Sequence, residues 1–460
     1  MTDAERLRTI FHAYDVRGVV PDEFDARLAY AIGVGFARFA AEQSEGSTKV
    51  LVGRDMRSSG EELGAAFLAG AAATGSEVID LGLCSTDMCY FASGYLGAAA
   101  AMLTASHNPA RYNGVKFCLP GARPVGEESG LYTVRDYAIE AVADAPEHAP
   151  SPPGLESLDL LDAFATHVHS FVDLGRLAPL SVVADTANGM GGLIAPRIFA
   201  ALPFKLEVLY GELDGNFPNH PADPIQPENL ADLQALLLER HADVGLAFDG
   251  DADRVFLVDE TGSALSGSTT TAIVAKALLD KHPGATVLYN VICSKTVREV
   301  IAENGGHGIR TRVGHSFIKS VMAETGALFG GEHSGHYYFA DNYRADSGII
   351  AAVVVLETLS RTGSSLSQLR APFERYAASG EINSTVQHPE EIIAELRARA
   401  LTSGADIDEL DGLTADFGAW WFNLRPSNTE PLLRLNVEAQ TADELGPHVE
   451  ELLATIRAQN

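Results

Sequence analysis

Short apolar runs alternate with longer segments of helical spacing along most of the chain. Residues 49–53 form a brief apolar run, residues 61–74 are rich in alanine with helical spacing, and residues 77–81 are apolar again. This alternation is typical of a mostly parallel sheet with crossover helices. Because it recurs at 180–209 and at 270–304, the pattern predicts several similar α/β units.

Breaks in this pattern suggest where the units end. Residues 145–154 contain four prolines, which fix φ and remove backbone donors, so this segment is the clearest linker. A polar turn is expected at 259–263 and a further break near 369–372. Beyond that point the parallel pattern stops, and an amphipathic helix is predicted at 442–457. The last part of the sequence therefore predicts a smaller α+β unit.

Length and composition narrow the class of protein. The chain has 460 residues, enough for about three domains at ~150 residues each. Hydrophobic residues make up 46%, which excludes wholesale disorder. Lys and Arg number 33 against 62 Asp and Glu, a formal net charge of −29. That excess argues against a nucleic-acid partner, which demands surplus cations, and against docking on an anionic membrane.

The expected location is the cytoplasm. Residues 1–6 are charged and lack the apolar core of a secretory signal, and the apolar stretch 349–356 is far shorter than the ~20 residues that span a bilayer. The four cysteines show no C-x-x-C spacing and are expected to be free thiols. We therefore expect a soluble protein with no membrane partner.

The first segment with candidate chemistry is T-A-S-H-N-P at 104–109, which follows the apolar run 97–103. Ser106 lies on a loop directly after a predicted buried strand, a good place for a nucleophile, and His107 and Asn108 beside it can donate hydrogen bonds. The alternative is a turn that caps a helix, since Ser, Asn and Pro are common turn residues.

The second segment, D-G-D-A-D-R, carries three carboxylates at alternate positions, Asp249, Asp251 and Asp253. Ionised carboxylates this close together require a cation, and hard oxygen ligands suit Mg²⁺ or Ca²⁺. With Glu260 they match positions 1, 3, 5 and 12 of an EF-hand, but Arg254 stands where that turn needs Gly. The flanks also read as strands rather than helices. Metal binding is therefore favoured over an EF-hand and over a solvated acidic turn.

The third segment is G-G-E-H-S-G-H at 330–336. Its glycines permit close backbone approach, while Glu, Ser and His supply acceptors and donors suited to hydroxyl groups. A hairpin turn with polar side chains is the alternative.

The fourth segment is R-P-S-N-T-E-P at 425–431, with Arg434 soon after. A guanidinium followed by hydroxyl and amide donors on a tight turn can surround a phosphate dianion. A helix N-cap without a ligand is the alternative, and only the paired arginines favour the phosphate site.

Taken together and in this order, the four segments resemble the active-site loops of the α-D-phosphohexomutases. T-A-S-H-N-P is similar to that family's phosphoserine loop, D-G-D-A-D-R to its metal loop, G-E-H-S-G-H to its sugar-binding loop and R-P-S-N-T-E-P to its phosphate-binding loop. Y-D-V-R-G at 14–18 and D-G-N-F-P-N-H at 214–220 resemble the phosphomannomutase/phosphoglucomutase branch. One such match could be accidental, whereas four in order are specific.

The resemblance implies an α/β fold of four domains rather than three. Three related α/β domains with mixed sheets and a smaller C-terminal α+β domain would surround a central cleft. The implied limits are 1–150, 151–260, 261–372 and 373–460, and each domain would contribute one of the four loops. A monomer and a homodimer both stay open.

The resemblance also implies reversible phosphoryl transfer between the 1- and 6-positions of a hexose phosphate. Ser106 would pass its phosphoryl group to the free hydroxyl, giving a 1,6-bisphosphate that turns end over end before a phosphate returns to the serine. Mg²⁺ would be held by Asp249, Asp251, Asp253 and Ser106, and a hexose 1,6-bisphosphate would act as activator. Because contacts at O3 and O4 do not distinguish C2, both mannose and glucose phosphates are expected substrates.

The remaining roles are carried over by position. Lys116, Arg17 and His336 are candidates for the general acid and base, in no ranked order, and His107 would support the phosphoserine loop. The implied substrate-binding residues are Tyr14, Glu332, Ser334, Arg254, Arg425, Ser427, Asn428, Thr429 and Arg434.

Some points stay open in the sequence. Ile292 occupies a position where the family often has a lysine. The sequence leaves open whether Lys295 reaches the site in place of that lysine. One alternative is a sugar-phosphate-binding protein without catalysis, but it would need a damaged nucleophile or metal loop, and both are intact. Another alternative is a phosphatase that hydrolyses the phosphoserine. Despite the net charge, nine cations in or beside the loops predict a positive cleft: Arg17, Arg54, Arg57, Arg111, Lys116, Arg254, Arg312, Arg425 and Arg434.

Overall fold

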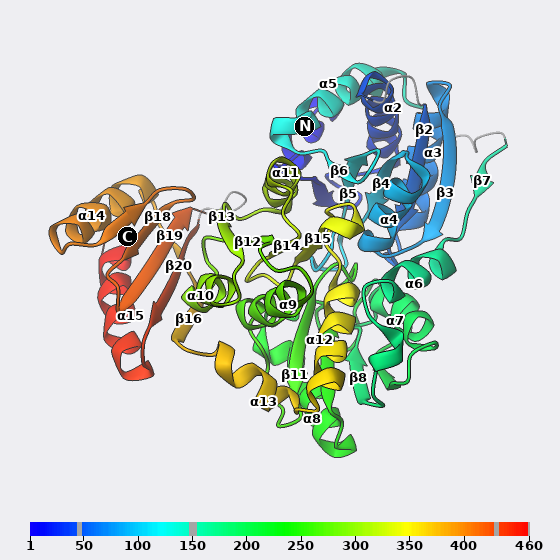
Figure 1. Ribbon diagram of the computed structural model, residues 1–460. Helices are drawn as coiled ribbons and strands as arrows, with labels where there is room; N and C mark the ends of the chain where they lie inside the picture. The colour runs from blue at the N-terminus through cyan, green and yellow to red at the C-terminus, as the bar shows by residue number, and fades with distance from the viewer. Residues whose placement is uncertain (44–47, 147–153, 427–431, 459–460) are drawn as a thin grey trace.

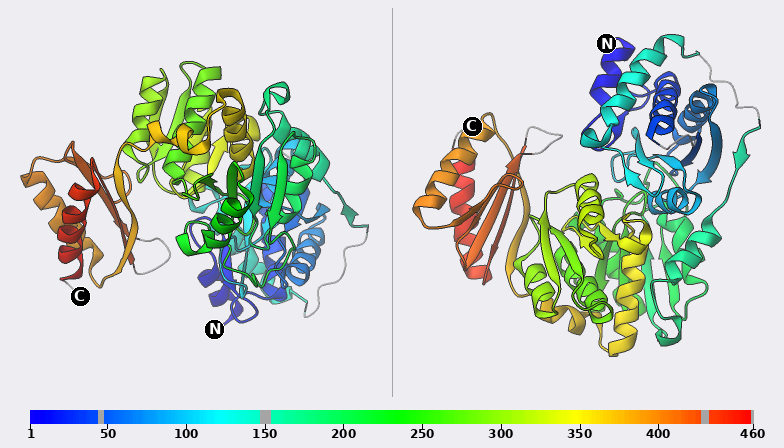
Figure 2. Two further views of the ribbon diagram at one scale, coloured as in Figure 1. Left: turned by 90° about the horizontal axis from the view of Figure 1, so that it is seen from below. Right: turned by 45° about the horizontal axis from the view of Figure 1, so that its top comes forward.

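The computed structural model describes residues 1–43, 48–146, 154–426 and 432–458. Figure 1 shows three α/β units massed together and a fourth, smaller unit, coloured orange to red, to one side. Both views of Figure 2 place this fourth unit beside the third and apart from the bulk of the first two. The predicted fold class, three α/β units followed by a smaller α+β unit, is confirmed.

The first unit is a mixed sheet with helices on both faces. Its strands are β1 (Val16–Val19), β2 (Lys49–Arg54), β3 (Glu77–Leu83), β4 (Ala99–Leu103), β5 (Tyr112–Leu119), β6 (Arg123–Pro124) and β7 (Glu156–Ser157), and its helices are α1 (Asp3–Ile10), α2 (Ala26–Gln43), α3 (Gly60–Ala73), α4 (Thr86–Leu96) and α5 (Leu131–Ala141). The strand order is β1-β5-β4-β2-β3-β7, with β6 beside β5. Val50 and Val52 join the core under α2 and α3, whereas Leu51 joins the core under α4. Burial on both faces explains why β2 is an unbroken apolar run.

The second and third units are smaller sheets of the same kind. The second contains β8 (Ser181–Asp185), β9 (Lys205–Leu209), β10 (Val244–Phe248) and β11 (Val255–Asp259) with α6 (Leu161–His169), α7 (Gly191–Phe199) and α8 (Ala231–Arg240). The third contains β12 (Thr286–Asn290), β13 (His307–Thr311), β14 (Phe329–Gly331) and β15 (Tyr337–Phe339) with α9 (Gly267–Lys281), α10 (Lys295–Glu303), α11 (His315–Thr325), α12 (Gly348–Thr362) and α13 (Leu366–Arg370).

All three sheets share one strand order, which places three of the loops at equivalent points. The order is β5-β4-β2-β3 in the first, β11-β10-β8-β9 in the second and β15-β14-β12-β13 in the third. In each set the first two strands form an antiparallel hairpin and the other neighbours pair in parallel. The connections within these hairpins, 104–111, 249–254 and 332–336, hold the first two candidate segments and all of the third except its first two glycines, which end β14. The strands that flank the second segment also confirm that it is not an EF-hand.

The fourth unit is an antiparallel sheet in the order β16-β20-β19-β18-β17. Its strands are β16 (Ala377–Thr385), β17 (Asp406–Asp408), β18 (Leu413–Asp416), β19 (Trp420–Pro426) and β20 (Leu432–Ala439), and its helices are α14 (Pro389–Thr402) and α15 (Ala442–Arg457). Arg425, which begins the fourth candidate segment on β19, lies directly opposite Arg434 on β20.

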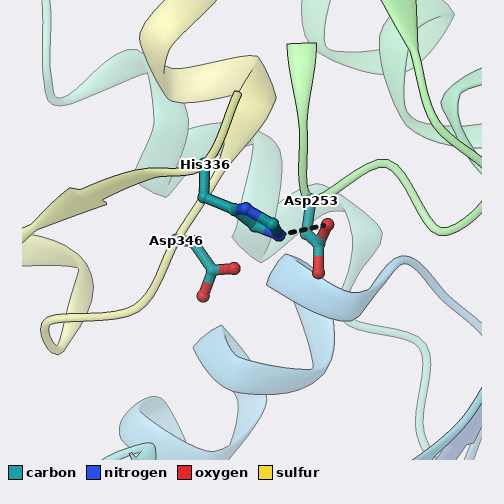
Figure 3. Close-up of side chains that lie close together, drawn as sticks. All are labelled: Asp253, His336 and Asp346. Atoms are coloured by element: carbon teal, nitrogen blue, oxygen red, sulfur yellow. Dashed lines mark ion pairs between the residues drawn. The ribbon is translucent and has the colours of Figure 1, made fainter. Parts of the chain in front are cut away.

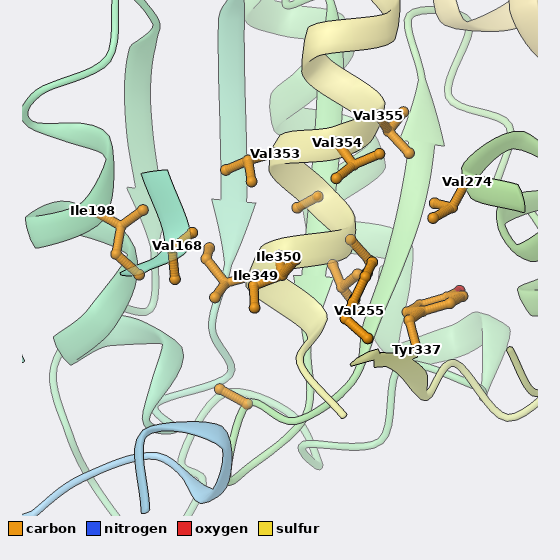
Figure 4. Close-up of a cluster of buried hydrophobic side chains, with 14 of the residues drawn as sticks. Val168, Ile198, Val255, Val274, Tyr337, Ile349, Ile350, Val353, Val354 and Val355 are labelled. Carbon is orange, nitrogen blue, oxygen red and sulfur yellow. The ribbon is translucent and has the colours of Figure 1, made fainter. Parts of the chain in front are cut away.

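Helix α12 joins the cores of the second and third units. It is buried from Gly348 to Leu359, and Figure 4 shows its apolar side chains between Val168 and Ile198 on one side and Val274 and Tyr337 on the other. The longest apolar run of the sequence is thus the shared core helix. Among the described residues, no single helix has the length and apolarity to cross a membrane, although α12 and the segment that follows it, bent by 98°, meet those criteria as a pair.

Candidate active site

The phosphoserine-like loop and the acidic loop meet at a hydrogen bond between Ser106 and Asp249. Ser106 Oγ lies 2.8 Å from Asp249 Oδ2 and 3.3 Å from a terminal nitrogen of Arg254. The two backbones also touch, because a Cβ on Gly250 would lie only 2.4 Å from the carbonyl oxygen of Ser106. The hydroxyl predicted to be the nucleophile therefore lies at the junction of the first two units, with 4% of the residue exposed.

The backbone of Ser106 is held in an unusual conformation. Its φ is +48°, in the left-handed region that costs a non-glycine residue about 1–3 kcal/mol, and strain of this kind concentrates at functional sites. Its N–H donates to Thr104 Oγ1 at 2.8 Å. Local and long-range hydrogen bonds together offset the strain and fix the direction of the hydroxyl.

The long-range bonds come from Arg57, which lies beneath the loop. Its guanidinium donates to the backbone carbonyls of Ser106 and Asn108 at 2.8 and 2.7 Å, and to two further carbonyls at 2.9 Å. Asp55 holds it from the other side at 3.1 Å, and both side chains are fully buried. The sequence placed Arg57 among cations directed at the cleft, but its donors are used to shape the loop. No local pattern signals this role, because its partners are some 50 residues away.

The segment 214–220 packs against Arg57 from the second unit. A Cβ on Gly215 would lie 2.5 Å from the Cα of Arg57. His220 ties this segment to the end of β8, with Nε2 3.0 Å from Asp185 Oδ2. Burial favours neutral imidazole, but the hydrogen bond and the charge of Asp185 outweigh it and raise the pKa of His220 above its ordinary value.

A raised His220 pKa predicts how this tie contributes to stability. The contribution is fully present below the unfolded pKa of about 6.5 and is lost as pH rises through the higher folded pKa. We therefore expect His220→Gln to lower the free energy of unfolding more at about pH 5.5 than at about pH 8.5. Urea unfolding of both proteins at the two pH values measures the difference; equal losses would show that the charged pair does not stabilise the segment.

The acidic loop brings its three carboxylates together. Ligand oxygens of Asp249, Asp251 and Asp253 all lie within 4.8 Å of one another, and none of the three residues is more than 1% exposed. Among the described residues, Asp251 Oδ1 and Asp253 Oδ1 have no hydrogen-bond partner. Buried carboxylates with unpartnered oxygens are suitable ligands for a hard divalent cation. The residues present therefore fit a metal site.

Two cations of the protein already neutralise part of this cluster. Lys116 Nζ lies 2.8 Å from Asp251 Oδ2 and 2.6 Å from Asp253 Oδ2, and Arg254 lies 2.9 Å from Asp249 Oδ2. Burial favours the neutral forms, but these pairs outweigh it, so the pKa of Lys116 is raised and that of Asp251 is lowered. Burial and the neighbouring aspartates raise the pKa of Asp249. The two ion pairs thus keep Lys116 in its charged form at neutral pH.

His107 lies beside the serine as a neutral ring. Burial and the charge of Arg254 hold its pKa well below the ordinary value. Its Nδ1 accepts from Arg254 and lies 3.3 Å from Ser106 Oγ. Arg17 supports the same loop by donating to Asn108 Oδ1 at 2.6 Å. These contacts agree with a role in holding the loop.

The predicted sugar-binding loop reaches the same cluster from the third unit. His336 Nε2 lies 3.7 Å from Asp253 Oδ1, as Figure 3 shows, and the backbones of His336 and Arg254 form an antiparallel bridge. Ser334 Oγ lies 2.9 Å from His336 Nδ1. Asp346, the third side chain in Figure 3, is paired with Lys319 at 2.7 Å. Three of the four loops are therefore in direct contact.

Glu332 in this loop is fixed by three donors. It accepts from Asn290 Nδ2 at 3.1 Å, from the Gly314 N–H at 3.2 Å and from the Tyr338 hydroxyl at 2.6 Å. The same neighbourhood holds Tyr14 of the first unit, whose ring packs edge-on against Phe317 of α11 with centroids 5.8 Å apart. The structure thus links the Y-D-V-R-G segment to the third unit.

The two arginines of the fourth loop share a carboxylate that the sequence did not reveal. Glu381 lies 3.1 Å from Arg425 and 3.2 Å from Arg434. Like charges directly opposite on neighbouring strands repel, and Glu381 offsets this repulsion. The other predicted phosphate ligands, Ser427, Asn428 and Thr429, lie outside the described residues.

Lys295, whose approach to the site the sequence left open, is paired with residues of the fourth unit. Its Nζ lies 2.6 Å from Asp416 Oδ1 and 2.8 Å from the Gly418 carbonyl oxygen, both in the fourth unit. Its backbone N–H donates to Glu438 at 3.0 Å. Lys295 therefore joins the third unit to the fourth, and Ile292 nearby is buried.

Comparisons with known proteins agree with this geometry along the whole chain. Family models described as phosphoglucomutase/phosphomannomutase match as alpha/beta/alpha domain I at 8–134, domain II at 161–262, domain III at 266–376 and C-terminal domain at 381–455. A relative from Xanthomonas campestris pv. campestris called "Phosphohexose mutases" is 41% identical, over 94% of this chain and 95% of its own. The phosphomannomutase/phosphoglucomutase of Pseudomonas aeruginosa is 37% identical, over 95% and 93%.

A solved structure gives the same result. The phosphoglucomutase/phosphomannomutase family protein of Burkholderia thailandensis superposes with a TM-score of 0.87 at 32% identity, covering 98% of both chains. With matches in each of its four units and relatives of this identity over nearly its full length, the chain belongs to the phosphoglucomutase/phosphomannomutase family.

Proposed function

We propose that this protein interconverts the 1- and 6-phosphates of mannose and glucose, with Ser106 as the phosphoryl carrier. The observation that carries the proposal is the buried contact of Ser106 Oγ with Asp249 Oδ2 at 2.8 Å, at the junction of the phosphoserine-like and acidic loops. Membership of the family supports the reaction class. The closeness of Lys116, Arg254 and His336 supplies the groups that such a transfer needs.

The transfer itself exchanges one P–O bond for another. The free hydroxyl of the sugar attacks the phosphorus on Ser106 and gives its proton to a general base, while the bond from phosphorus to Oγ breaks and Oγ takes up a proton. The resulting 1,6-bisphosphate turns end over end. Ser106 Oγ then gives up its proton and attacks the other phosphate, whose bond to the sugar breaks as the sugar oxygen takes up a proton. The serine is phosphorylated again, so the cycle closes without net hydrolysis.

Asp249, Asp251 and Asp253, together with an oxygen on Ser106, are the proposed holders of Mg²⁺. Mg²⁺ prefers oxygen ligands, and when bound it offsets the negative charge on the transferring group. Arg254 contributes a guanidinium to the same place, because it contacts both Asp249 and Ser106 Oγ. A hexose 1,6-bisphosphate is the proposed activator, since it can phosphorylate a bare Ser106.

Lys116 is the proposed proton donor. It is buried beside two carboxylates of the acidic loop, which keep it in the charged form that carries a proton. A charged ammonium there can give a proton to the departing oxygen and take it back in the reverse direction. His336 and Arg17 remain candidates for the partner role.

The third and fourth loops are proposed to hold the sugar. Glu332 and Ser334 contact the O3 and O4 hydroxyls, which are alike in glucose and mannose, so the C2 configuration is not read. The phosphate that is not reacting binds Arg425 and Arg434, with Ser427, Asn428 and Thr429 from the loop between them. Because Glu381 already bridges the two guanidiniums, they are aligned before the phosphate arrives.

A coupled assay tests the proposed reaction. Purified protein is given mannose 1-phosphate or glucose 1-phosphate with Mg²⁺ and a trace of glucose 1,6-bisphosphate, and the appearance of the 6-phosphate is followed. We expect turnover of both sugars. The absence of 6-phosphate from either substrate would contradict the proposal, and release of inorganic phosphate at a similar rate would show a phosphatase instead.

A further inference from the structure

The start of helix α4 in the first unit contacts the acidic loop of the second. Thr86, the first residue of α4, donates its hydroxyl to Asp251 Oδ2 at 2.6 Å, and its N–H donates to the Asp251 carbonyl oxygen at 3.0 Å. Both residues are 0% exposed, although 165 positions separate them in the sequence. One residue thus fixes both the backbone and the side chain of Asp251.

The same helix start is itself held in place by the third unit. Asp87 Oδ2 accepts from the hydroxyl of Ser347 at 2.7 Å, and Ser347 is the N-cap of α12. A Cβ on Gly348 would lie 2.6 Å from the backbone carbon of Arg254, so the start of α12 also presses against the acidic loop. The acidic loop is therefore bracketed by two helix starts from different units, and Thr86 cannot move independently of them.

The hydroxyl of Thr86 decides which oxygen of Asp251 is left for a ligand. Oδ2 receives both the Thr86 hydroxyl and Lys116 Nζ. Oδ1 has no hydrogen-bond partner among the described residues. Hydrogen bonds of this kind orient metal-binding carboxylates, and their loss typically weakens metal binding 10–100-fold. The orientation is set by a side chain that no candidate segment contains.

We propose that Thr86 is a positioning residue that presents Asp251 to the divalent cation and so sets the affinity of the site. This inference rests on the proposed function, in which Asp251 is a metal ligand. Thr86 touches neither the sugar nor the phosphoryl group; it acts through Asp251. Removal of its hydroxyl frees the carboxylate to turn toward Lys116 and costs affinity for the cation.

Isothermal titration of metal-free protein with Mg²⁺ tests this directly. Thr86→Val keeps the shape and removes the hydroxyl, and we expect its Kd for Mg²⁺ to rise about 10-fold or more. Thr86→Ser keeps the hydroxyl and should bind Mg²⁺ almost as the unaltered protein does. The matched control is Thr271→Val, because Thr271 is also 0% exposed and its hydroxyl has no hydrogen-bond partner among the described residues; its Mg²⁺ affinity should not change.

Kinetics separate positioning from structural damage. In the mutase assay, Thr86→Val should need more Mg²⁺ for half-activation, while its kcat at saturating Mg²⁺ should recover most of the original value. If Thr86→Val does not fold, Thr86→Ser and Thr86→Ala form a second pair that differs by the hydroxyl alone. Unchanged Mg²⁺ affinity on loss of the hydroxyl, or equal weakening in the Ser and Val variants, would overturn the inference. Since the titration needs no turnover, a failed mutase assay leaves this test readable.

Discussion

We expect Ser106→Ala to lower mutase activity by at least about 10³-fold while the protein stays folded, as is typical when a covalent nucleophile is removed. Asp249, Arg254 and His107 remain in place, but Ser106 Oγ, the proposed phosphoryl carrier beside them, is gone. The substitution removes one hydroxyl from a loop whose shape is set by Arg57 and Thr104. The coupled assay measures the loss, and intact-mass spectrometry should find phosphoprotein after incubation with glucose 1,6-bisphosphate only when Ser106 is present.

Ser93→Ala is the matched control for this variant. Ser93 is a buried serine of the same unit that donates to the Ala98 carbonyl oxygen at 2.7 Å, outside the four loops. Its hydroxyl also accepts from the buried Ala122 N–H at 3.2 Å, so its loss should reduce the free energy of unfolding by about 1–3 kcal/mol and leave phosphorylation and turnover close to normal. Substantial turnover by Ser106→Ala would refute the role of the serine, as would phosphoprotein formed at another residue.

Local pattern was enough to predict the elements and the positions of the loops. The buried run that became β4 and the helix predicted at 442–457 depend only on neighbouring residues, and α15 spans that same range. Three loops could be placed because each follows an apolar run that ends in polar residues. Their equivalence became visible only in the structure, because the shared strand order β5-β4-β2-β3 leaves no repeat in the sequence.

Partners far apart in the sequence could not be predicted. Glu381 reaches Arg425 across 44 positions, and Thr86 reaches Asp251 across 165. Such pairs are chosen by how whole units pack, and a single glutamate on a strand or a threonine at a helix start has no distinguishing pattern. Other ion pairs reduce the positive charge predicted for the cleft, because Lys116 and Arg254 are each paired with carboxylates of the acidic loop. The electrostatic potential of the cleft therefore depends on whether a cation is bound at the acidic loop.

We expect Lys116→Met to lower the free energy of unfolding of the metal-free protein strongly. The ammonium is the partner of Asp251 and Asp253 at 2.8 and 2.6 Å, and all three groups are buried. Removal of one member of a buried ion pair leaves uncompensated charge, which costs about 3–5 kcal/mol. Thermal and urea unfolding without divalent cation measure this loss. Turnover should also fall if Lys116 donates the proton, and excess Mg²⁺ should not restore it.

The effect of Mg²⁺ on this variant distinguishes charge balance from packing. The ammonium repels a cation at the same carboxylates, so its removal should tighten Mg²⁺ binding and make Mg²⁺ raise the melting temperature more than in the unaltered protein. Lys295→Met is the matched control: its side chain is 8% exposed, as that of Lys116 is, and it pairs with Asp416 at 2.6 Å away from the acidic loop. That control should lose some stability but show the ordinary response to Mg²⁺. If Mg²⁺ raised the melting temperature equally in both variants, Lys116 and Mg²⁺ would not share the same carboxylates. That result would contradict the proposed metal site at the acidic loop.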